Sequence, residues 1–177
     1  MTINWLLTLI DRLMAMLYPK SPITDEGVPE VPKDTIPPDT TLEPTQVLYQ
    51  TAYDCLGQHL SLNDYIPPEV GCAQAVSKIL LKCGYNMPKK GISTVVKLTD
   101  WMLANGFKEV STYERGLIIT GRAPDWAHIG VTGNEWIMSN TSNTIISKGL
   151  IRGSFQANYQ RENWYKVFPI VRMFSPI

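Results

Sequence analysis

The sequence has few of the side chains that bind metals or build a disulfide framework. Its 177 residues include three cysteines, Cys55, Cys72 and Cys83, and two histidines, His59 and His128. No Cys-x-x-Cys pair is present, so these residues do not offer the clustered ligands of a structural zinc site, and we expect no metal. Because the number of cysteines is odd, at least one thiol stays free, although Cys55 and Cys83 remain candidates for a pair.

Long apolar runs and basic runs are also missing. The apolar stretch at residues 4–18 is shorter than the roughly 20 residues that span a bilayer, and Asp11 and Arg12 interrupt it. It also lacks the basic region that opens a secretory signal. No basic run with interleaved aromatic residues occurs, so we expect no nucleic-acid partner.

Charge is balanced over the whole chain but not along it. The formal net charge is zero, whereas residues 46–177 carry thirteen Lys or Arg against nine Asp or Glu. A mild positive excess suits an anionic polymer such as a cell wall, although most such charges simply solvate a surface.

Composition divides the chain into three segments. Residues 1–18 contain an amphipathic helix, which could bind a membrane surface, dock on a partner or pack on its own domain. Residues 19–45 hold seven of the thirteen prolines and six acidic residues, a composition typical of an extended, semi-rigid linker. Residues 46–177 have the apolar content of a globular domain.

Within the globular segment the pattern changes from helices to strands. Apolar spacings of three and four predict helices at 46–56 with Thr45 as N-cap, from Cys72 to about Lys82, and from Ser93 or Thr94 to Asn105. Alternating and β-branched residues then predict strands at 116–120, 128–132, 135–140, 164–168 and 170–174. Helices followed by antiparallel strands indicate an α+β domain, with the N-terminal helices packed on the sheet.

The second predicted helix begins with a cysteine, in the sequence Gly71-Cys72-Ala73-Gln74-Ala75-Val76. A thiol in the first turn lies at the positive end of the helix dipole, which favours the thiolate. The thiolate is the nucleophilic form of cysteine, so Cys72 is the candidate nucleophile. The alternative is a small buried side chain, because free cysteine is common in protein cores.

A histidine lies on the predicted strand Ala127-His128-Ile129-Gly130-Val131. Alternation puts Ile129 and Val131 on one face of the sheet and His128 on the other, where it can face a cleft. A structural histidine is the alternative.

The residue facing His128 depends on the turn around Gly133-Asn134. A three-residue turn would place Asn140 opposite the histidine, and a two-residue turn would place Ser139 there. Either side chain can accept the imidazole N–H and fix the ring. An asparagine in this position would complete a Cys-His-Asn arrangement.

Three stretches, Gly71–Val76, Ala127–Val131 and Trp136-Ile137-Met138-Ser139-Asn140, resemble the papain-like NlpC/CHAP cell-wall hydrolases. Within that group they look most like phage-encoded endolysin-type proteins, and the likeness covers about residues 46–174. It implies a papain-like α+β fold with a cleft between helices and sheet, and no metal or organic cofactor. Cys72 would be the nucleophile, His128 the general base and Asn140 the residue that orients the histidine. The motif departs from the family in having Gly-Cys-Ala where many members have Asp-Cys-Ser.

The resemblance also implies a substrate and a location. The enzyme would cleave an amide bond of peptidoglycan, as an endopeptidase or an N-acetylmuramoyl-L-alanine amidase. It would be phage-encoded and act in the host periplasm or cell wall, or from the virion, with residues 1–18 attaching it to a membrane surface or a phage assembly partner. Two alternatives stay open: a cysteine protease or amidase effector that acts on another amide, and a non-catalytic virion or tail-associated protein that binds the wall.

Acyl transfer also needs hydrogen-bond donors for the developing oxyanion. The backbone N–H of Cys72, at the start of its helix, is one candidate. The candidate side chains for the oxyanion or the substrate are Gln58, Asn63, Tyr65 and Ser139. Capping of the loop is the alternative role for the first three.

Overall fold

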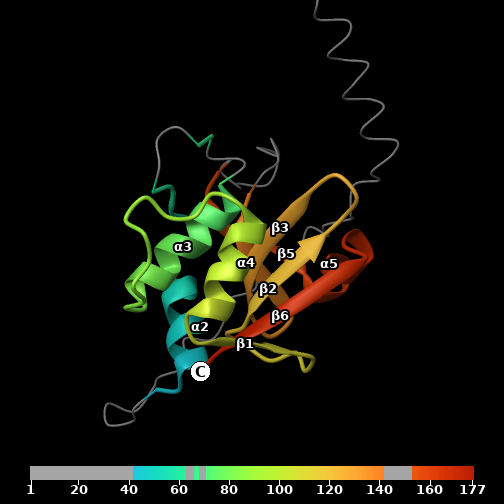
Figure 1. Ribbon diagram of the computed structural model, residues 1–177. Helices are drawn as coiled ribbons and strands as arrows, with labels where there is room; N and C mark the ends of the chain where they lie inside the picture. The colour runs from blue at the N-terminus through green and yellow to red at the C-terminus, as the bar shows by residue number, and fades with distance from the viewer. Residues whose placement is uncertain (1–41, 63–65, 68–70, 142–152) are drawn as a thin grey trace, which may run out of the picture. The chain divides into compact units, whose positions relative to one another are not determined.

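The computed structural model describes residues 42–62, 66–67, 71–141 and 153–177 of the chain (Figure 1). The predicted amphipathic helix lies outside these residues, as does the predicted linker apart from its last four positions. Within the described part of the chain, no helix has both the length and the apolar character needed to cross a membrane.

The described residues form an α+β domain, as the order of the sequence patterns predicts. Its elements in chain order are α2 (Pro44–Asp54), α3 (Cys72–Lys82), α4 (Val95–Ala104), β1 (Phe107–Val110), β2 (Ile118–Arg122), β3 (Ala127–Thr132), β4 (Trp136–Asn140), β5 (Phe155–Gln160), α5 (Arg161–Val167) and β6 (Ile170–Pro176). Helices α2, α3 and α4 precede the sheet in the chain, and α5 is inserted between its last two strands.

The helices that precede the sheet lie close to their predicted positions. α2 begins two residues earlier than predicted, because Glu43 rather than Thr45 is its N-cap and forms a reciprocal capping box with Gln46. α3 has the predicted bounds. α4 follows Thr94, whose hydroxyl accepts a hydrogen bond from the backbone N–H of Lys97 at 3.3 Å.

The strands of the described residues form one antiparallel sheet in the order β1-β6-β2-β3-β4-β5. Figure 1 shows α2, α3 and α4 on one side of this sheet and α5 on the other. Side chains from the sheet that pack with α5 include Leu117, Ile119, Ile137 and Met173. The alternate residues, buried toward the other helices, include Ile118, Ile129, Val131, Met138 and Phe174. The central strands therefore bury side chains on both faces, and these include polar ones such as Thr120, His128 and Ser139.

The strand predicted at 164–168 is wrong, because Arg161–Val167 form α5. Aromatic residues favour strands by intrinsic preference, which is why the sequence pattern indicated one. Trp164 and Phe168 are four residues apart, however, so one turn of helix turns both rings toward the sheet. Their ring centroids lie 4.6 Å apart, and both side chains are buried. Packing of these rings outweighs the local preference.

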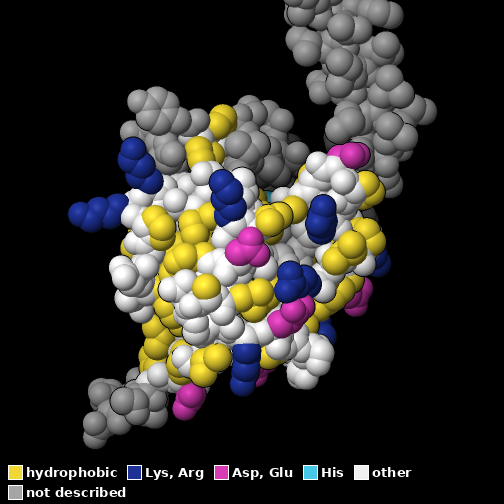
Figure 2. All heavy atoms as spheres, in the orientation of Figure 1, with side chains coloured by type: hydrophobic (Ala, Val, Ile, Leu, Met, Phe, Trp, Pro, Cys, Tyr) yellow, Lys and Arg dark blue, Asp and Glu magenta, His cyan; other side chains and the backbone are white. Residues whose placement is uncertain are grey.

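Charged side chains are mixed on the surface shown in Figure 2. Lys and Arg residues lie there as separate side chains, with Asp and Glu between them. On that face of the described residues, charge alone therefore marks no binding surface.

Gly121 in β2 leaves the space that Phe168 occupies. A Cβ added at Gly121 would lie 2.3 Å from Cγ of Phe168, so the ring would have to move. We expect Gly121→Ala to lower the free energy of unfolding by about 1–3 kcal/mol, the usual cost of overpacking, as measured by urea denaturation. Phe168→Leu is the matched change, since it removes ring atoms from the contact. The double variant should lose less stability than the sum of the two single losses, and strict additivity would contradict this account.

Candidate active site

Cys72 is the first residue of α3, and Gly71 is the N-cap of that helix. The cysteine is 9% exposed. Its sulfur accepts hydrogen bonds from the backbone N–H groups of Ala73 and Ile129. The packing of α3 on the sheet therefore brings the thiol to β3, one residue after His128.

The strands β3 and β4 stop pairing next to Ile129, the residue that contacts Cys72. Their ladder ends at the Gly130–Ser139 pair and does not include Ile129. The N–H of Ile129 is thereby available to the sulfur of Cys72, and the carbonyl of Asn140 hydrogen-bonds the ring of the neighbouring histidine. In a continuous ladder of the same register, Ile129 and Asn140 would pair with each other instead. The parting of the strands thus supplies two backbone groups to the candidate site.

His128 lies within an aromatic cluster on the α5 face of the sheet and is 3% exposed. Four ring centroids lie 5.7–6.3 Å from that of the imidazole, those of Trp126, Tyr159, Trp164 and Phe168. Burial lowers the pKa of His128 to about 4, while the carbonyl of Asn140 favours the protonated ring and opposes this shift in part. The ring is therefore neutral at neutral pH, and it is enclosed rather than facing an open cleft.

A serine and an asparagine hold the ring of His128. Its Nε2 lies 3.0 Å from Oγ of Ser139, and that Oγ donates a hydrogen bond of 2.7 Å to Oδ1 of Asn158. Because the serine proton is used in the second bond, the serine oxygen accepts in the first, and Nε2 carries the ring proton. In the neutral ring Nδ1 then has the lone pair and can take a proton. The carbonyl of Asn140 accepts only from an N–H group, so it favours the ring that is protonated at both nitrogens.

The connection between β3 and β4 is longer than either predicted turn. Thr132 pairs with Ile137, so four residues separate the paired positions rather than two or three. Asn140 therefore does not lie opposite His128, and strand alternation puts its side chain on the face away from Ser139. Ser139 reaches the histidine diagonally across the two strands. The expected pairing of Asn140 with His128 through the side chain is wrong.

Two glycines explain this geometry. The N–H of Gly133 donates to the carbonyl of Trp136 at 2.7 Å and closes the longer turn. A Cβ added at Gly130 would lie 2.5 Å from the carbonyl oxygen of Met138 and 3.1 Å from Cβ of Ser139. Gly130 therefore permits the close approach of the strands through which Ser139 reaches the histidine.

The thiolate expected at Cys72 is not favoured in this structure. Burial raises the pKa of Cys72, and the N–H groups of Ala73 and Ile129 lower it by less. The first turn of α3 does supply one of these donors, as its position predicts, but the loss of hydrating water outweighs that benefit. The resting site thus pairs a thiol with a neutral imidazole.

This protonation state has a chemical consequence. Iodoacetamide reacts with thiolates, so at pH 7 it should alkylate Cys72 more slowly in the folded protein than in the same chain unfolded in urea. The rate in the folded protein should rise as the solution becomes more alkaline. Peptide mapping by mass spectrometry reports the modified cysteine. Faster alkylation of Cys72 in the folded protein at pH 7 would instead reveal a preformed thiolate–imidazolium pair.

The loop before α3 holds three candidate oxyanion donors, Gln58, Asn63 and Tyr65. Nε2 of Gln58 donates a hydrogen bond of 2.7 Å to the carbonyl of Asp54, so this side chain caps the end of α2. Asn63 and Tyr65 lie outside the described residues. The remaining described candidate is the backbone N–H of Cys72, which hydrogen-bonds the sulfur of its own residue in the resting site.

Cys55 and Cys83 are free thiols, and the pair considered from the sequence does not form. Burial raises the pKa of both. In the residues that the structure describes, no three His, Cys, Asp or Glu side chains are grouped to hold a metal ion.

The sequence analysis missed β5, which supplies Asn158 and Tyr159 to the site. Tyr159 pairs with Ile137, whereas Ala157 pairs with the next residue of β4, so Asn158 is the extra residue of a β-bulge. A bulge turns two consecutive side chains to one face, and both of these side chains lie toward the histidine. The alternation in Phe-Gln-Ala-Asn-Tyr-Gln is the signal that could have revealed the strand.

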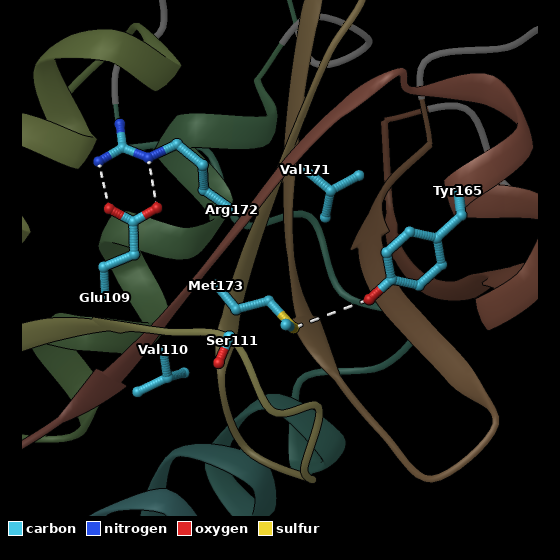
Figure 3. Close-up of a pocket in the computed structure, with 7 residues that line it drawn as sticks. All are labelled: Glu109, Val110, Ser111, Tyr165, Val171, Arg172 and Met173. Carbon is cyan, nitrogen blue, oxygen red and sulfur yellow. Dashed lines mark hydrogen bonds and ion pairs between the residues drawn. The ribbon is translucent and has the colours of Figure 1, made fainter.

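A cavity of about 530 Å³ lies apart from this site, against β1, β6 and α5 (Figure 3). Arg172 in its lining donates two hydrogen bonds to Glu109, at 2.9 and 2.8 Å. The hydroxyl of Tyr165 donates to the sulfur of Met173 at 3.8 Å. Figure 3 shows these two pairs at opposite ends of the hollow. None of the candidate residues lines this cavity, so it contributes nothing to the chemistry of Cys72.

No protein-family model matches the chain, and no curated protein matches it either.

Proposed function

We propose that this chain is a papain-like cysteine hydrolase that cleaves an amide bond of peptidoglycan, as an endopeptidase or an N-acetylmuramoyl-L-alanine amidase. The observation that carries the proposal is the contact between Cys72, at the start of α3, and β3 beside His128. The order of helices and antiparallel strands supports the papain-like arrangement. Peptidoglycan as the substrate is supported by the resemblance of the cysteine and histidine stretches to the NlpC/CHAP hydrolases.

The same resemblance leads us to place the enzyme in the host periplasm or cell wall, or in the virion, as a phage-encoded protein. Residues 1–18 would attach it to a membrane surface or an assembly partner, and residues 19–45 would act as the spacer. The sequence patterns of these two segments support this part of the proposal.

In the first chemical step, Nδ1 of His128 takes the thiol proton as the sulfur of Cys72 attacks the amide carbonyl carbon. The new S–C bond moves an electron pair onto the carbonyl oxygen. This transfer creates a negative and a positive charge together, and their attraction in a buried site offsets part of the cost of burying each. The Asn140 carbonyl favours the imidazolium that forms, and Ser139 keeps its orientation.

In the next steps the imidazolium of His128 gives its proton to the amide nitrogen, the C–N bond breaks, and the amine leaves. Water then attacks the acyl group on Cys72 while the imidazole takes a proton from that water. The C–S bond breaks, the acid leaves, and the imidazolium returns the proton to sulfur. One amide and one water give one amine and one acid, and the enzyme regains its resting state.

Ser139 should matter more for turnover than Asn140. Ser139→Ala removes the hydroxyl that holds Nε2, and we expect kcat to fall by about 10–100-fold, less than for loss of the base itself. Asn140→Ala keeps the backbone carbonyl that contacts the ring, so its kcat should change by less than the serine variant. Unfolding midpoints measured beside the rates separate lost stability from lost orientation. A larger fall in kcat for Asn140→Ala than for Ser139→Ala would show that the Ser139 hydroxyl is not needed to hold the ring.

Digestion of purified sacculi tests the proposed function. The full chain should release muropeptides whose masses identify the cleaved bond, and Cys72→Ala should release none. Parallel incubation with folded and unfolded protein substrates tests the alternative of a protease or an effector amidase. Cleavage of proteins without release of muropeptides would overturn the assignment to peptidoglycan.

A wall-binding protein without activity is the second candidate, and one observation favours it. His128 is enclosed by aromatic rings and neutral, and burial also disfavours the thiolate of Cys72. Such a protein should bind sacculi and therefore sediment with them, but it should release no muropeptides. Equal sedimentation of the full chain and of Cys72→Ala, without any products, would establish this second function.

A further inference from the structure

Tyr159 on β5 faces the same site as His128. Its ring centroid lies 5.7 Å from that of the imidazole, and its ring meets Trp164 edge-on, at 5.1 Å and 84°. The β-bulge at Asn158 aims both side chains to this face of the sheet. Contacts on several sides hold the ring, so the position of the hydroxyl is set before any substrate binds.

The hydroxyl of Tyr159 lies within the electrostatic reach of Cys72. Burial, with a smaller contribution from a negative charge on Cys72, raises the pKa of Tyr159 to about 12. The hydroxyl therefore stays protonated at any working pH and is always able to donate a hydrogen bond. Tyr159 itself is partly exposed, so a ligand in front of the site can reach it.

The hydroxyl of Tyr159 also has no hydrogen-bond partner among the residues that the structure describes. The hydroxyls of Tyr113 and Ser139 differ, because they donate to the carbonyl of Gly133 and to Asn158. Because Tyr159 is partly exposed, water can accept from this hydroxyl in the free protein. A carbonyl oxygen of a bound ligand can take the place of that water.

We propose that the hydroxyl of Tyr159 donates a hydrogen bond to the carbonyl oxygen of the scissile amide as Cys72 attacks it. This inference rests on the proposed function and names a second donor beside the backbone N–H of Cys72. The oxygen gains negative charge in the transition state, so a fixed donor in a partly buried site stabilises that state more than the bound substrate. Such a donor affects kcat rather than KM.

Tyr159→Phe tests the inference, because it removes the hydroxyl and keeps the ring that packs on His128 and Trp164. The substrate is a muropeptide released from sacculi and shown to be cleaved by the full chain. We expect kcat to fall by about 10–100-fold, at the lower end of what loss of one oxyanion donor costs, with KM unchanged. Tyr165→Phe is the matched control, since that hydroxyl contacts Met173 at the separate cavity and should leave kcat unchanged.

The two levels of the proposal fail in different ways. If the full chain cleaves the muropeptide and Tyr159→Phe cleaves it at the same kcat, the role of Tyr159 is overturned and the proposed function stands. A raised KM with unchanged kcat overturns that role equally, because it reports uniform binding. If the full chain cleaves no wall amide, the proposed function fails and this inference fails with it.

Discussion

Cys72→Ala should abolish the release of muropeptides from sacculi while the domain stays folded. The variant lacks the sulfur that forms the acyl-enzyme, and removal of a nucleophile from a cysteine or serine hydrolase lowers turnover by about 10⁴-fold or more. Only one buried atom is lost, at the first position of α3, so the effect on stability should be about 1 kcal/mol. Product release measured by mass spectrometry and the unfolding midpoint measured by circular dichroism report the two effects separately.

Cys83→Ala is the control for this experiment. Cys83 is also a free thiol, but it lies at the C-terminal end of α3, away from β3. Its replacement should leave turnover unchanged. The opposite pattern would be an unfolded Cys72→Ala and an active Cys72→Ser. That pattern would show that Cys72 is a core residue and that the nucleophile lies elsewhere.

The sequence was sufficient to place the two chemical groups on their elements. The glycine before Cys72 and the apolar spacing after it predicted the bounds of α3, because a buried helix face leaves a clear period. The alternation around His128 likewise predicted that Ile129 and Val131 share one face of the sheet and that His128 lies on the other. Both apolar residues are buried, but His128 is enclosed by rings and does not face the expected cleft. Both signals are local, and each depends on one periodicity.

The partners of His128 could not be predicted, because they depend on contacts between strands. A turn one or two residues longer than expected changes the pairing of every residue in β4, and Ser139 replaces Asn140 beside the ring. Asn158 and Tyr159 reach the site through a bulge, which no periodic pattern shows. The low pKa of His128 depends on rings from β5 and α5, and α5 itself was predicted as a strand.

His128→Gln should lower turnover by about 10³-fold or more, since the variant has no base to take the thiol proton. The same change should alter how stability depends on pH. The pKa of His128 is about 4 in the folded protein, against about 6.5 in an unfolded chain. Between these values the unfolded state binds more protons, so the free energy of unfolding should rise with pH from about 4 to about 6.5. For a fully buried ring the contribution is about 3 kcal/mol, and it is lost as pH falls through this range.

Urea denaturation at a series of pH values measures this dependence, with His59→Gln as the control. His59 is the other histidine of the chain, an exposed residue whose Nδ1 lies 3.2 Å from the carbonyl of Gly153. His59→Gln should keep both turnover and the rise in stability above pH 4, whereas His128→Gln should lose both together. If His128→Gln lost the pH dependence and kept full turnover, His128 would be a buried structural histidine, and Cys72 would require another base. Loss of turnover with the pH dependence intact would show that the pKa of His128 is near its ordinary value in the folded protein, and therefore that the ring is hydrated.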